Sequence, residues 1–177
     1  MARLTIFCAV AACVFASVAA AGIYPGKSQA LMPAPKEVGF TNMLAFQPAK
    51  KPKAALSRGY KNGVVGIFQK GTTTAPTETV ITAYVYTSSA NALLAWKNAC
   101  TKCKVVSAPA GLKLKAEAGT SNGQPTLHEI TVCANVYVDV VEQGKVKTLT
   151  LDTDVAKSTN AVYQRAVHGG LSSCSAK

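Results

Sequence analysis

Alternation of apolar and polar positions predicts β-strands in the middle of the chain. In TVITAYVYTS, residues 79–88, Ile81 and Val85 share one face of a strand while Tyr84 and Tyr86 share the other. β-branched and aromatic residues are enriched in strands. The apolar run GVVGIFQ, residues 63–69, predicts a further strand just before it.

The longest alternating stretch is LHEITVCANVYVDVV, residues 127–141, which we interpret as one strand with Ile130 and Val138 on its apolar face. A Gly-containing hairpin at 142–145 leads into a last strand, VKTLTLDT. GLKLKAE, residues 111–117, predicts a strand with one wet face, on which Lys113, Lys115 and Glu117 point to solvent.

Two segments have helical periodicity. From Ser89 to Cys100 the residues Leu93, Trp96 and Cys100 form one apolar stripe, and Ser89 can cap the segment. A second helix is capped by Asp154 and ends at Gly169-Gly170, and its apolar stripe contains Val155, Thr159, Val162 and Ala166.

The order of these elements is strand, strand, helix, strand, strand, strand, helix. One-sided strands and a hairpin favour antiparallel pairing, with helices covering the apolar face of the sheet. We therefore predict an α+β domain over residues 63–177. Its architecture is a two-layer sandwich, with a mainly antiparallel sheet of about five strands, two helices on one face and disulfide staples.

Two segments precede this domain. Residues 1–20 have one cation, Arg3, before the apolar run from Leu4 to Val18 and then small residues, which predicts a secretory signal peptide. An uncleaved membrane anchor is the alternative, although the run is shorter than a membrane span needs. Residues 21–62 contain five prolines and predict an extended basic arm that docking can order.

The net charge of +11 is concentrated near the N-terminus. Between residues 22 and 76, seven lysines and Arg58 face one acid, Glu37, which gives +7. The segment AKKPKAALSRGYKNG attracts polyanions through charge and counterion release. Outside the cell these are acidic glycans, anionic lipid surfaces or cell-wall polymers rather than nucleic acid; the alternative is a solvated linker. The candidate polyanion-binding residues are Lys50, Lys51, Lys53, Arg58 and Lys61.

Cysteine spacing raises three possibilities for Cys100 and Cys103: a redox centre, half of a metal site, or disulfides. Four cysteines remain after removal of the signal peptide, and an even number in an exported chain favours two disulfides. Three connectivities are open. We favour a bridge from the end of the first helix to the long strand at Cys133, and a second bridge that holds the tail at Cys174.

The redox and metal alternatives are weaker. A thioredoxin-type nucleophile sits at a helix N-terminus, whereas Cys100 lies at the C-terminal end of its predicted helix. A four-thiolate zinc site needs a second short pair, but Cys133 and Cys174 are far apart in the sequence. We assign no metal and no cofactor.

No catalytic motif of high specificity is present. A triad would need His128 or His168 beside a nucleophile and a carboxylate, and a GxSxG elbow is absent. We assign no catalytic residue. The remaining candidate surface is aromatic: Tyr84, Tyr86 and Tyr137 share one sheet face, which is either open for binding or covered by Phe40, Leu44 and Phe46 of the arm.

The stretches YVYTSSANALLAWKNAC and VCANVYVDVV, followed by a final helix, resemble PknH-like extracytoplasmic sensor domains of actinobacteria. The resemblance covers at most residues 79–168 and implies a disulfide-bearing α+β module. It rests on a strand, a helix with Trp and Cys, and a Val-rich strand, and we assign the chain to no family on it.

The residues together predict a secreted, non-enzymatic binding protein that engages anionic extracellular polymers or cell surfaces through its basic arm. One alternative is a secreted effector, toxin or sensor-like module with a specific protein or small-molecule target. A small secreted hydrolase that uses His128 or His168 is the other.

Overall fold

A computed structural model describes residues 22–71, 77–108, 111–121, 123–144, 153–172 and 174. The predicted signal peptide and the strand predicted after residue 145 lie outside this part of the chain. Among the described residues, no helix is long and apolar enough to cross a membrane.

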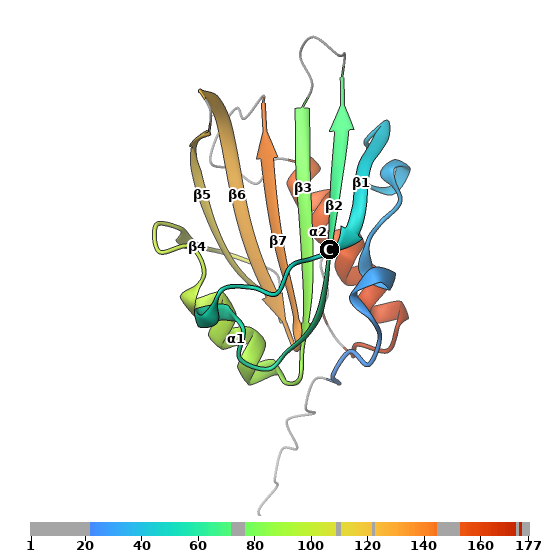
Figure 1. The fold of residues 1–177 in the computed structure, drawn as a ribbon, viewed down its shortest axis with the longest axis vertical. Helices are drawn as coiled ribbons and strands as arrows, with labels where there is room; N and C mark the ends of the chain where they lie inside the picture. The colour runs from blue at the N-terminus through green and yellow to red at the C-terminus, as the bar shows by residue number, and fades with distance from the viewer. Residues whose placement is uncertain are drawn as a thin grey trace, which may run out of the picture.

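The described residues form a sheet of seven strands rather than about five, in which every neighbouring pair is antiparallel (Figure 1). The strand order across the sheet is β1-β2-β3-β7-β6-β5-β4. The α+β class and the antiparallel pairing are therefore confirmed. The strands are β1 (Asn42–Pro48), β2 (Tyr60–Lys70), β3 (Thr77–Tyr86), β4 (Lys104–Val106), β5 (Lys113–Ser121), β6 (Gln124–Cys133) and β7 (Val136–Gln143).

The two helices lie on opposite faces of the sheet, so the prediction of both on one face was wrong (Figure 1). α2 (Thr153–His168) packs Val162 and Ala166 against one apolar layer. α1 (Ser89–Asn98) packs Trp96 against the other, and its N-cap is Ser88 rather than Ser89. β3 and β7 are central strands with apolar or aromatic residues on both faces, so alternation alone does not tell which face a helix covers.

The predicted long strand 127–141 is in fact a hairpin, β6 followed by β7. Cys133 pairs with Val136, and the chain reverses through Ala134 (φ 47°) and Asn135. The reversal puts Cys133 and Val136 on the α2 face, and it puts Val132 and Tyr137 on the α1 face. Apolar and polar residues alternate regularly in both β6 and β7, and the turn between them contains no glycine. The sequence pattern therefore predicts a single strand.

Residues 22–62 contribute to the core as well as carrying charge. They form β1 and three short 3₁₀ helices, η1 (Ser28–Leu31), η2 (Pro35–Val38) and η3 (Ala54–Leu56). Phe40 packs on Phe68 of β2 with ring centroids 5.7 Å apart, and both side chains are buried. The other large buried side chains of this segment lie in the same layer: Tyr24, Leu31, Met32 and Val38.

Asn135 joins the N-terminal segment to the sheet. Its side chain is fully buried, and its Oδ1 accepts a hydrogen bond from the Tyr24 N–H at 2.7 Å. Its Nδ2 donates to the carbonyl oxygens of Tyr24 at 3.1 Å and Tyr86 at 3.0 Å. One side chain therefore satisfies buried backbone groups from two distant segments.

The disulfides are Cys100–Cys103 and Cys133–Cys174. The predicted bridge between the first helix and Cys133 was wrong, whereas the bridge that holds the tail at Cys174 is present. Cys133 and Cys174 are buried and 41 residues apart, so in the chain-entropy model their loop stabilises the fold by about 4 kcal/mol. Cys100–Cys103 closes a loop with a separation of three, which contributes about 2 kcal/mol in the same model.

A buried carboxyl lies beneath α2. Glu129 on β6 is 2% exposed, and its Oε1 accepts a hydrogen bond from Thr159 Oγ1 at 2.9 Å. No hydrogen-bond partner within the described residues reaches its Oε2. Burial raises the pKa of Glu129 to about 7, although the bond from Thr159 opposes the rise.

We expect Asn135→Ala to lower the free energy of unfolding by about 3 kcal/mol, because it leaves buried backbone groups of Tyr24 and Tyr86 without partners. Urea denaturation measures this. The control is Asn98→Ala, which removes an exposed bond to the Ala55 carbonyl and should cost less than about 1 kcal/mol. Equal losses in the two variants would contradict the role given to Asn135.

We expect Glu129→Gln to stabilise the protein by roughly 2 kcal/mol at pH 8.5 and to have little effect near pH 4. The pKa of Glu129 is higher in the folded state, about 7, than in the unfolded state, near 4.5. Protonation of Glu129 therefore favours folding. This contribution to stability is fully present below pH 4.5 and is lost as the pH rises through 7. Unfolding curves across this pH range measure the difference. A pH-independent effect would contradict a buried, neutral Glu129.

Candidate functional site

The connection between β1 and β2 crosses the face of the sheet that α1 covers (Figure 1). We call residues 49–59 the strap. The Tyr86 hydroxyl donates to the Leu56 carbonyl at 2.9 Å, and Asn98 Nδ2 of α1 donates to the Ala55 carbonyl at 3.2 Å. At the start of the strap, the Tyr60 hydroxyl donates to the Ala49 carbonyl at 3.4 Å. The strap is therefore attached to both the sheet and α1.

The candidate polyanion-binding residues lie on the strap and at the start of β2. Every one of these five side chains is exposed. Within the described residues, none of them forms an ion pair. Exposed cations without acidic partners that lie close together along the chain give this part of the surface a positive potential. These cations are Lys50, Lys51, Lys53, Arg58 and Lys61.

The three candidate tyrosines are neighbours but do not form an open aromatic surface. Tyr137 lies 5.7 Å from Tyr84 and 6.4 Å from Tyr86 between ring centroids. Tyr86 and Tyr137 are buried under α1 and the strap, and only Tyr84 is partly exposed. Burial also raises the pKa of each of the three hydroxyls, which keeps them neutral.

The arm residues expected to cover these tyrosines lie elsewhere. Phe40 is buried in the layer on the α2 face. Leu44 and Phe46 are 54% and 52% exposed on the edge strand β1. The cover comes from the backbone of the strap instead.

A hollow of about 330 Å³ brings a strap cation and an aromatic side chain together. Lys50 and Tyr84 both line it, beside Gln47 and Thr82. Gly63 pairs with Tyr84 across β2 and β3, and a side chain at position 63 would collide with the tyrosine ring. A larger groove of about 450 Å³ lies between α1 and the strands β4 and β5, and is lined by Trp96, Lys97, Val105 and Lys113, among others.

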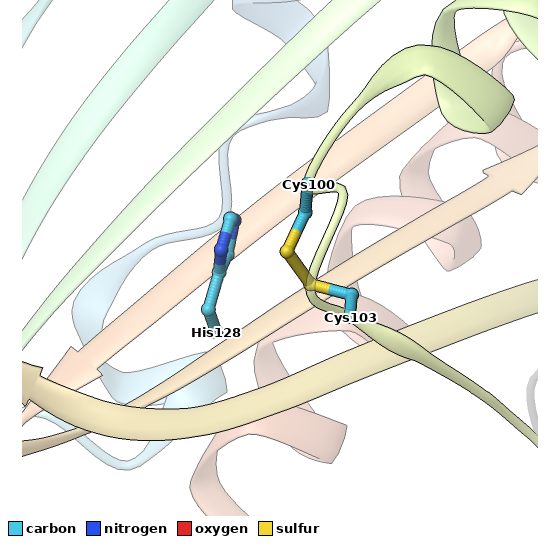
Figure 2. A group of neighbouring side chains, drawn as sticks. All are labelled: Cys100, Cys103 and His128. Atoms are coloured by element: carbon cyan, nitrogen blue, oxygen red, sulfur yellow. A yellow bond between two sulfur atoms is a disulfide. The ribbon is translucent and has the colours of Figure 1, made fainter.

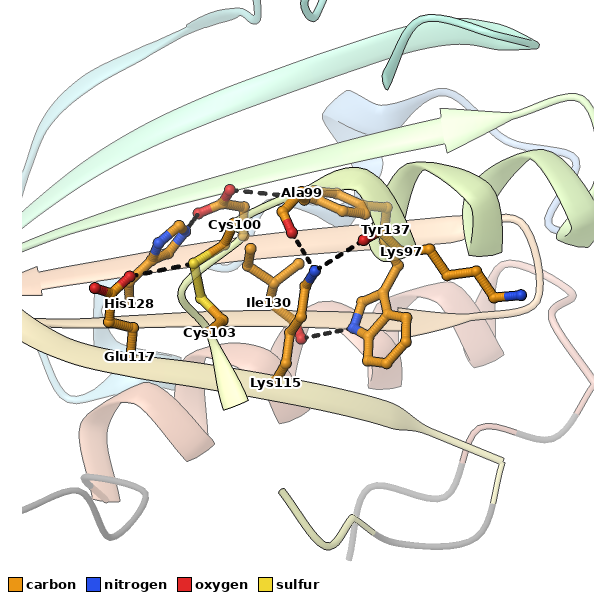
Figure 3. Close-up of a disulfide and its surroundings, with 11 residues drawn as sticks. Lys97, Ala99, Cys100, Cys103, Lys115, Glu117, His128, Ile130 and Tyr137 are labelled. Atoms are coloured by element: carbon orange, nitrogen blue, oxygen red, sulfur yellow. Dashed lines mark hydrogen bonds and ion pairs between the residues drawn. A yellow bond between two sulfur atoms is a disulfide. The ribbon is translucent and has the colours of Figure 1, made fainter. Parts of the chain in front are cut away.

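A second cluster on the same face surrounds the Cys100–Cys103 disulfide (Figures 2 and 3). Both sulfur atoms and a ring nitrogen of His128 lie within 4.8 Å of one another. Glu117 Oε2 is 3.3 Å from Cys100 Sγ. The cysteines follow the C-terminal end of α1, as the sequence predicted, and the sheet supplies the other groups from β5 and β6.

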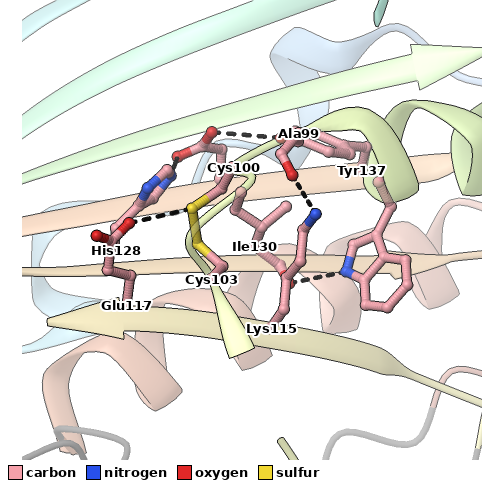
Figure 4. A network of polar contacts seen from close by, with 10 residues as sticks. Ala99, Cys100, Cys103, Lys115, Glu117, His128, Ile130 and Tyr137 are labelled. Carbon is pink, nitrogen blue, oxygen red and sulfur yellow. Dashed lines mark hydrogen bonds and ion pairs between the residues drawn. A yellow bond between two sulfur atoms is a disulfide. The ribbon is translucent and has the colours of Figure 1, made fainter. Parts of the chain in front are cut away.

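Asp139 of β7 fixes the orientation of the His128 ring, which lies beside Cys100 and Glu117 in Figure 4. Its Oδ1 lies 2.9 Å from His128 Nε2, and its Oδ2 accepts a hydrogen bond from the Tyr137 hydroxyl at 3.3 Å. Burial by itself would lower the pKa of His128. The hydrogen bond and charge of Asp139, with the charge of Glu117, outweigh this and raise the pKa above its ordinary value.

Lys115 is buried rather than on a wet face of β5, so that expectation was wrong. Its Nζ donates to the carbonyl of Ala99, the C-cap of α1, and lies 3.4 Å from the Lys97 carbonyl (Figure 3). It also lies 5.2 Å from the centroid of the Trp96 ring. A cation at a helix C-terminus stabilises the free carbonyls and the helix dipole, while burial lowers the pKa of Lys115.

The two histidines are separated. His168 is exposed at the end of α2, whereas His128 lies on the opposite side of the sheet. Within the described residues, the hydrogen-bond partner of His128 is Asp139, and no serine or threonine hydroxyl bonds to its ring. The geometry needed for a Ser-His-Asp triad is not present among these residues.

Sequence reasoning missed the cluster around Cys100, yet one signal for it exists. Asn122-Gly123 is a strong two-residue hairpin signal, and counting outward from it places Glu117 opposite His128. The register of β5 and β6 has this pairing. The approach of the cysteines and of Asp139 depends on the covering of the sheet by α1, which the local pattern does not reveal.

No family model matches the chain, and no curated protein matches it. Among solved structures, the chain is similar to the extracellular domain of PknH from Mycobacterium tuberculosis, with 18% identity and a TM-score of 0.43. The similarity covers 81% of this chain and 100% of that one. We draw no functional conclusion from a similarity at this level.

We expect Asp139→Asn to lower the pKa of His128, because the variant keeps the burial and loses the charge of the carboxylate. Proton NMR titration measures it in a His168→Gln background, which leaves His128 as the only histidine. Since the folded pKa is raised, the pair stabilises the wild type below pH ~6.5, and this contribution is lost as the pH rises through the folded pKa. An unchanged pKa in Asp139→Asn would contradict the assignment.

Proposed function

We propose that this protein is a secreted, non-enzymatic binding protein that holds an anionic extracellular polysaccharide on the strap. The observation that carries the proposal is the hollow in which Lys50 and Tyr84 meet, next to the other exposed cations. The polysaccharide class follows from this pairing, because it offers a cation and an aromatic side chain side by side.

Each group in the hollow matches one part of such a ligand. A sugar ring presents C–H groups that pack on an aromatic side chain, as Tyr84 provides. Lys50 pairs with a carboxylate or sulfate of the same residue, and Gln47 and Thr82 offer hydrogen-bonding groups beside it. Further along the strap, Lys51 and Lys53 meet the next charges of the polymer and release counterions, so binding weakens as salt is added.

The two disulfides of the fold support the proposed extracellular location. Two disulfides form and persist in oxidising compartments, and cytosolic proteins seldom keep them. The predicted signal peptide at residues 1–20 leads to the same compartment. Acidic glycans are abundant polyanions there, which favours them over nucleic acid as the ligand.

We expect the triple variant Lys50→Ala, Lys51→Ala, Lys53→Ala to elute from a sulfated or uronic-acid polysaccharide column at clearly lower salt than the wild type. The matched control removes three exposed lysines of the α2 side, Lys27, Lys36 and Lys157, and has the same net charge. It should elute close to the wild type. Co-elution of the two triple variants would contradict a role for the strap.

A second comparison separates sugar recognition from charge alone. Tyr84→Leu should weaken retention on the polysaccharide column by removing the aromatic surface of the hollow, while retention on a sulfonate cation exchanger stays unchanged. Substitutions are preferable to deletion of residues 22–61, since that segment contains β1 and buried core side chains. Equal retention of Tyr84→Leu and wild type on the polysaccharide would contradict the hollow as the sugar site.

A further inference from the structure

The cluster around Cys100 and Cys103 contains potential metal ligands that polysaccharide binding does not use. Two sulfur atoms and an imidazole nitrogen lie within 4.8 Å of one another (Figure 2). Thiolate and imidazole are the ligands that Zn²⁺ prefers in proteins, and Cys2His sets occur in its tetrahedral sites. In the disulfide form the sulfur atoms are bonded to each other and do not act as thiolate ligands.

The Cys100–Cys103 disulfide is placed where it can open. Both cysteines are partly exposed, whereas Cys133 and Cys174 are buried. Cys100 has a φ of 41°, a left-handed backbone conformation that is uncommon outside glycine and is often found at functional sites. Because the bridge joins two residues only three positions apart, its opening leaves the long-range connections of the fold in place.

The His128 ring is held by a carboxylate, as the rings of metal-binding histidines often are. His128 Nε2 is engaged by Asp139, so the other ring nitrogen carries the lone pair that a metal needs. A carboxylate that holds the far nitrogen of a ligating histidine is the usual outer-shell partner, and here the Tyr137 hydroxyl donates a hydrogen bond to that carboxylate.

Glu117 offers a fourth ligand. Its Oε2 lies 3.3 Å from Cys100 Sγ, and it comes from β5, directly opposite His128 in the register (Figure 3). The carboxylate of Glu117 therefore lies beside the group formed by the two sulfurs and the imidazole nitrogen, and three of the four groups are anionic when the cysteines are thiolates. A divalent cation offsets two of these three negative charges.

We propose that the reduced protein binds one Zn²⁺ ion through Cys100, Cys103, His128 and Glu117, and that the Cys100–Cys103 disulfide is the oxidised, metal-free form of this site. A dithiol supplies two electrons and two protons, which break the S–S bond and give two thiols while the dithiol becomes a disulfide. Zn²⁺ then displaces both thiol protons to solvent. The site is separate from the strap, so either proposal can fail without the other.

The test uses the purified full-length mature protein, reduced under native conditions with dithiothreitol and freed of it by anaerobic gel filtration. We expect two titratable thiols per molecule, because Cys133 and Cys174 are buried. Titration with Co²⁺ should then give thiolate-to-cobalt charge-transfer absorption and the visible bands of tetrahedral coordination, saturating at one equivalent and abolished by Zn²⁺. The oxidised protein should show none of these bands.

Matched variants assign the ligands. Cys100→Ser with Cys103→Ser should abolish the charge-transfer band, and His128→Gln should weaken Zn²⁺ binding by about 100-fold. Asp139→Asn should weaken it by about 10-fold through the orientation of His128. The control His168→Gln removes the exposed histidine of α2 and should bind as tightly as the wild type.

The proposal is overturned if the reduced wild type gives no charge-transfer band, or if His128→Gln and His168→Gln bind Zn²⁺ equally. Circular dichroism of each reduced variant shows whether it keeps the fold, and the Asp139→Asn variant, which retains all four ligands, remains a test if another variant is misfolded. Equal affinity of Asp139→Asn and wild type would also overturn the role given to His128.

Discussion

The fold depends on the three hydrogen bonds of the buried Asn135 side chain. Asn135 lies at the turn that connects β6 and β7. Its side-chain amide accepts a hydrogen bond from the Tyr24 N–H and donates to the carbonyl oxygens of Tyr24 and Tyr86. These bonds place the N-terminal segment along the α2 face, where its aromatic and aliphatic side chains complete the core. The chain then continues into β1, and β1 determines where the strap begins.

The opposite face has an apolar layer of its own, in which Trp96 and Tyr137 are buried, and polar contacts hold α1 and the strap against it. Lys115 holds the C-terminal end of α1, and the position of that end determines where Cys100 and Cys103 meet Glu117 and His128. The strap lies across the buried tyrosines and leaves only part of Tyr84 exposed. The α1 face therefore carries the cationic hollow and the cysteine cluster beside its own apolar layer.

The sequence predicts the strands with a clear alternation and the amphipathic α2, because burial on a defined side leaves a periodic signal. It does not predict β1, whose segment is interrupted by prolines, nor the turn at Ala134, which keeps the alternation on both sides. Of the candidate site, the cations and cysteines are evident from residue type. The burial of Tyr86, Tyr137 and Lys115 depends on how α1 and the strap cross the sheet, which is a long-range property.

The proposed function requires that an acidic polysaccharide binds at the strap. The most direct measurement is a titration of ¹⁵N-labelled protein with an oligosaccharide of uronic acids, followed by backbone amide chemical shifts. We expect saturable changes confined to residues 47–61 and to the part of β3 around Tyr84, and we expect them to disappear at high salt. Changes on η1, η2 and α2 instead, or no saturable change at low salt, would contradict it.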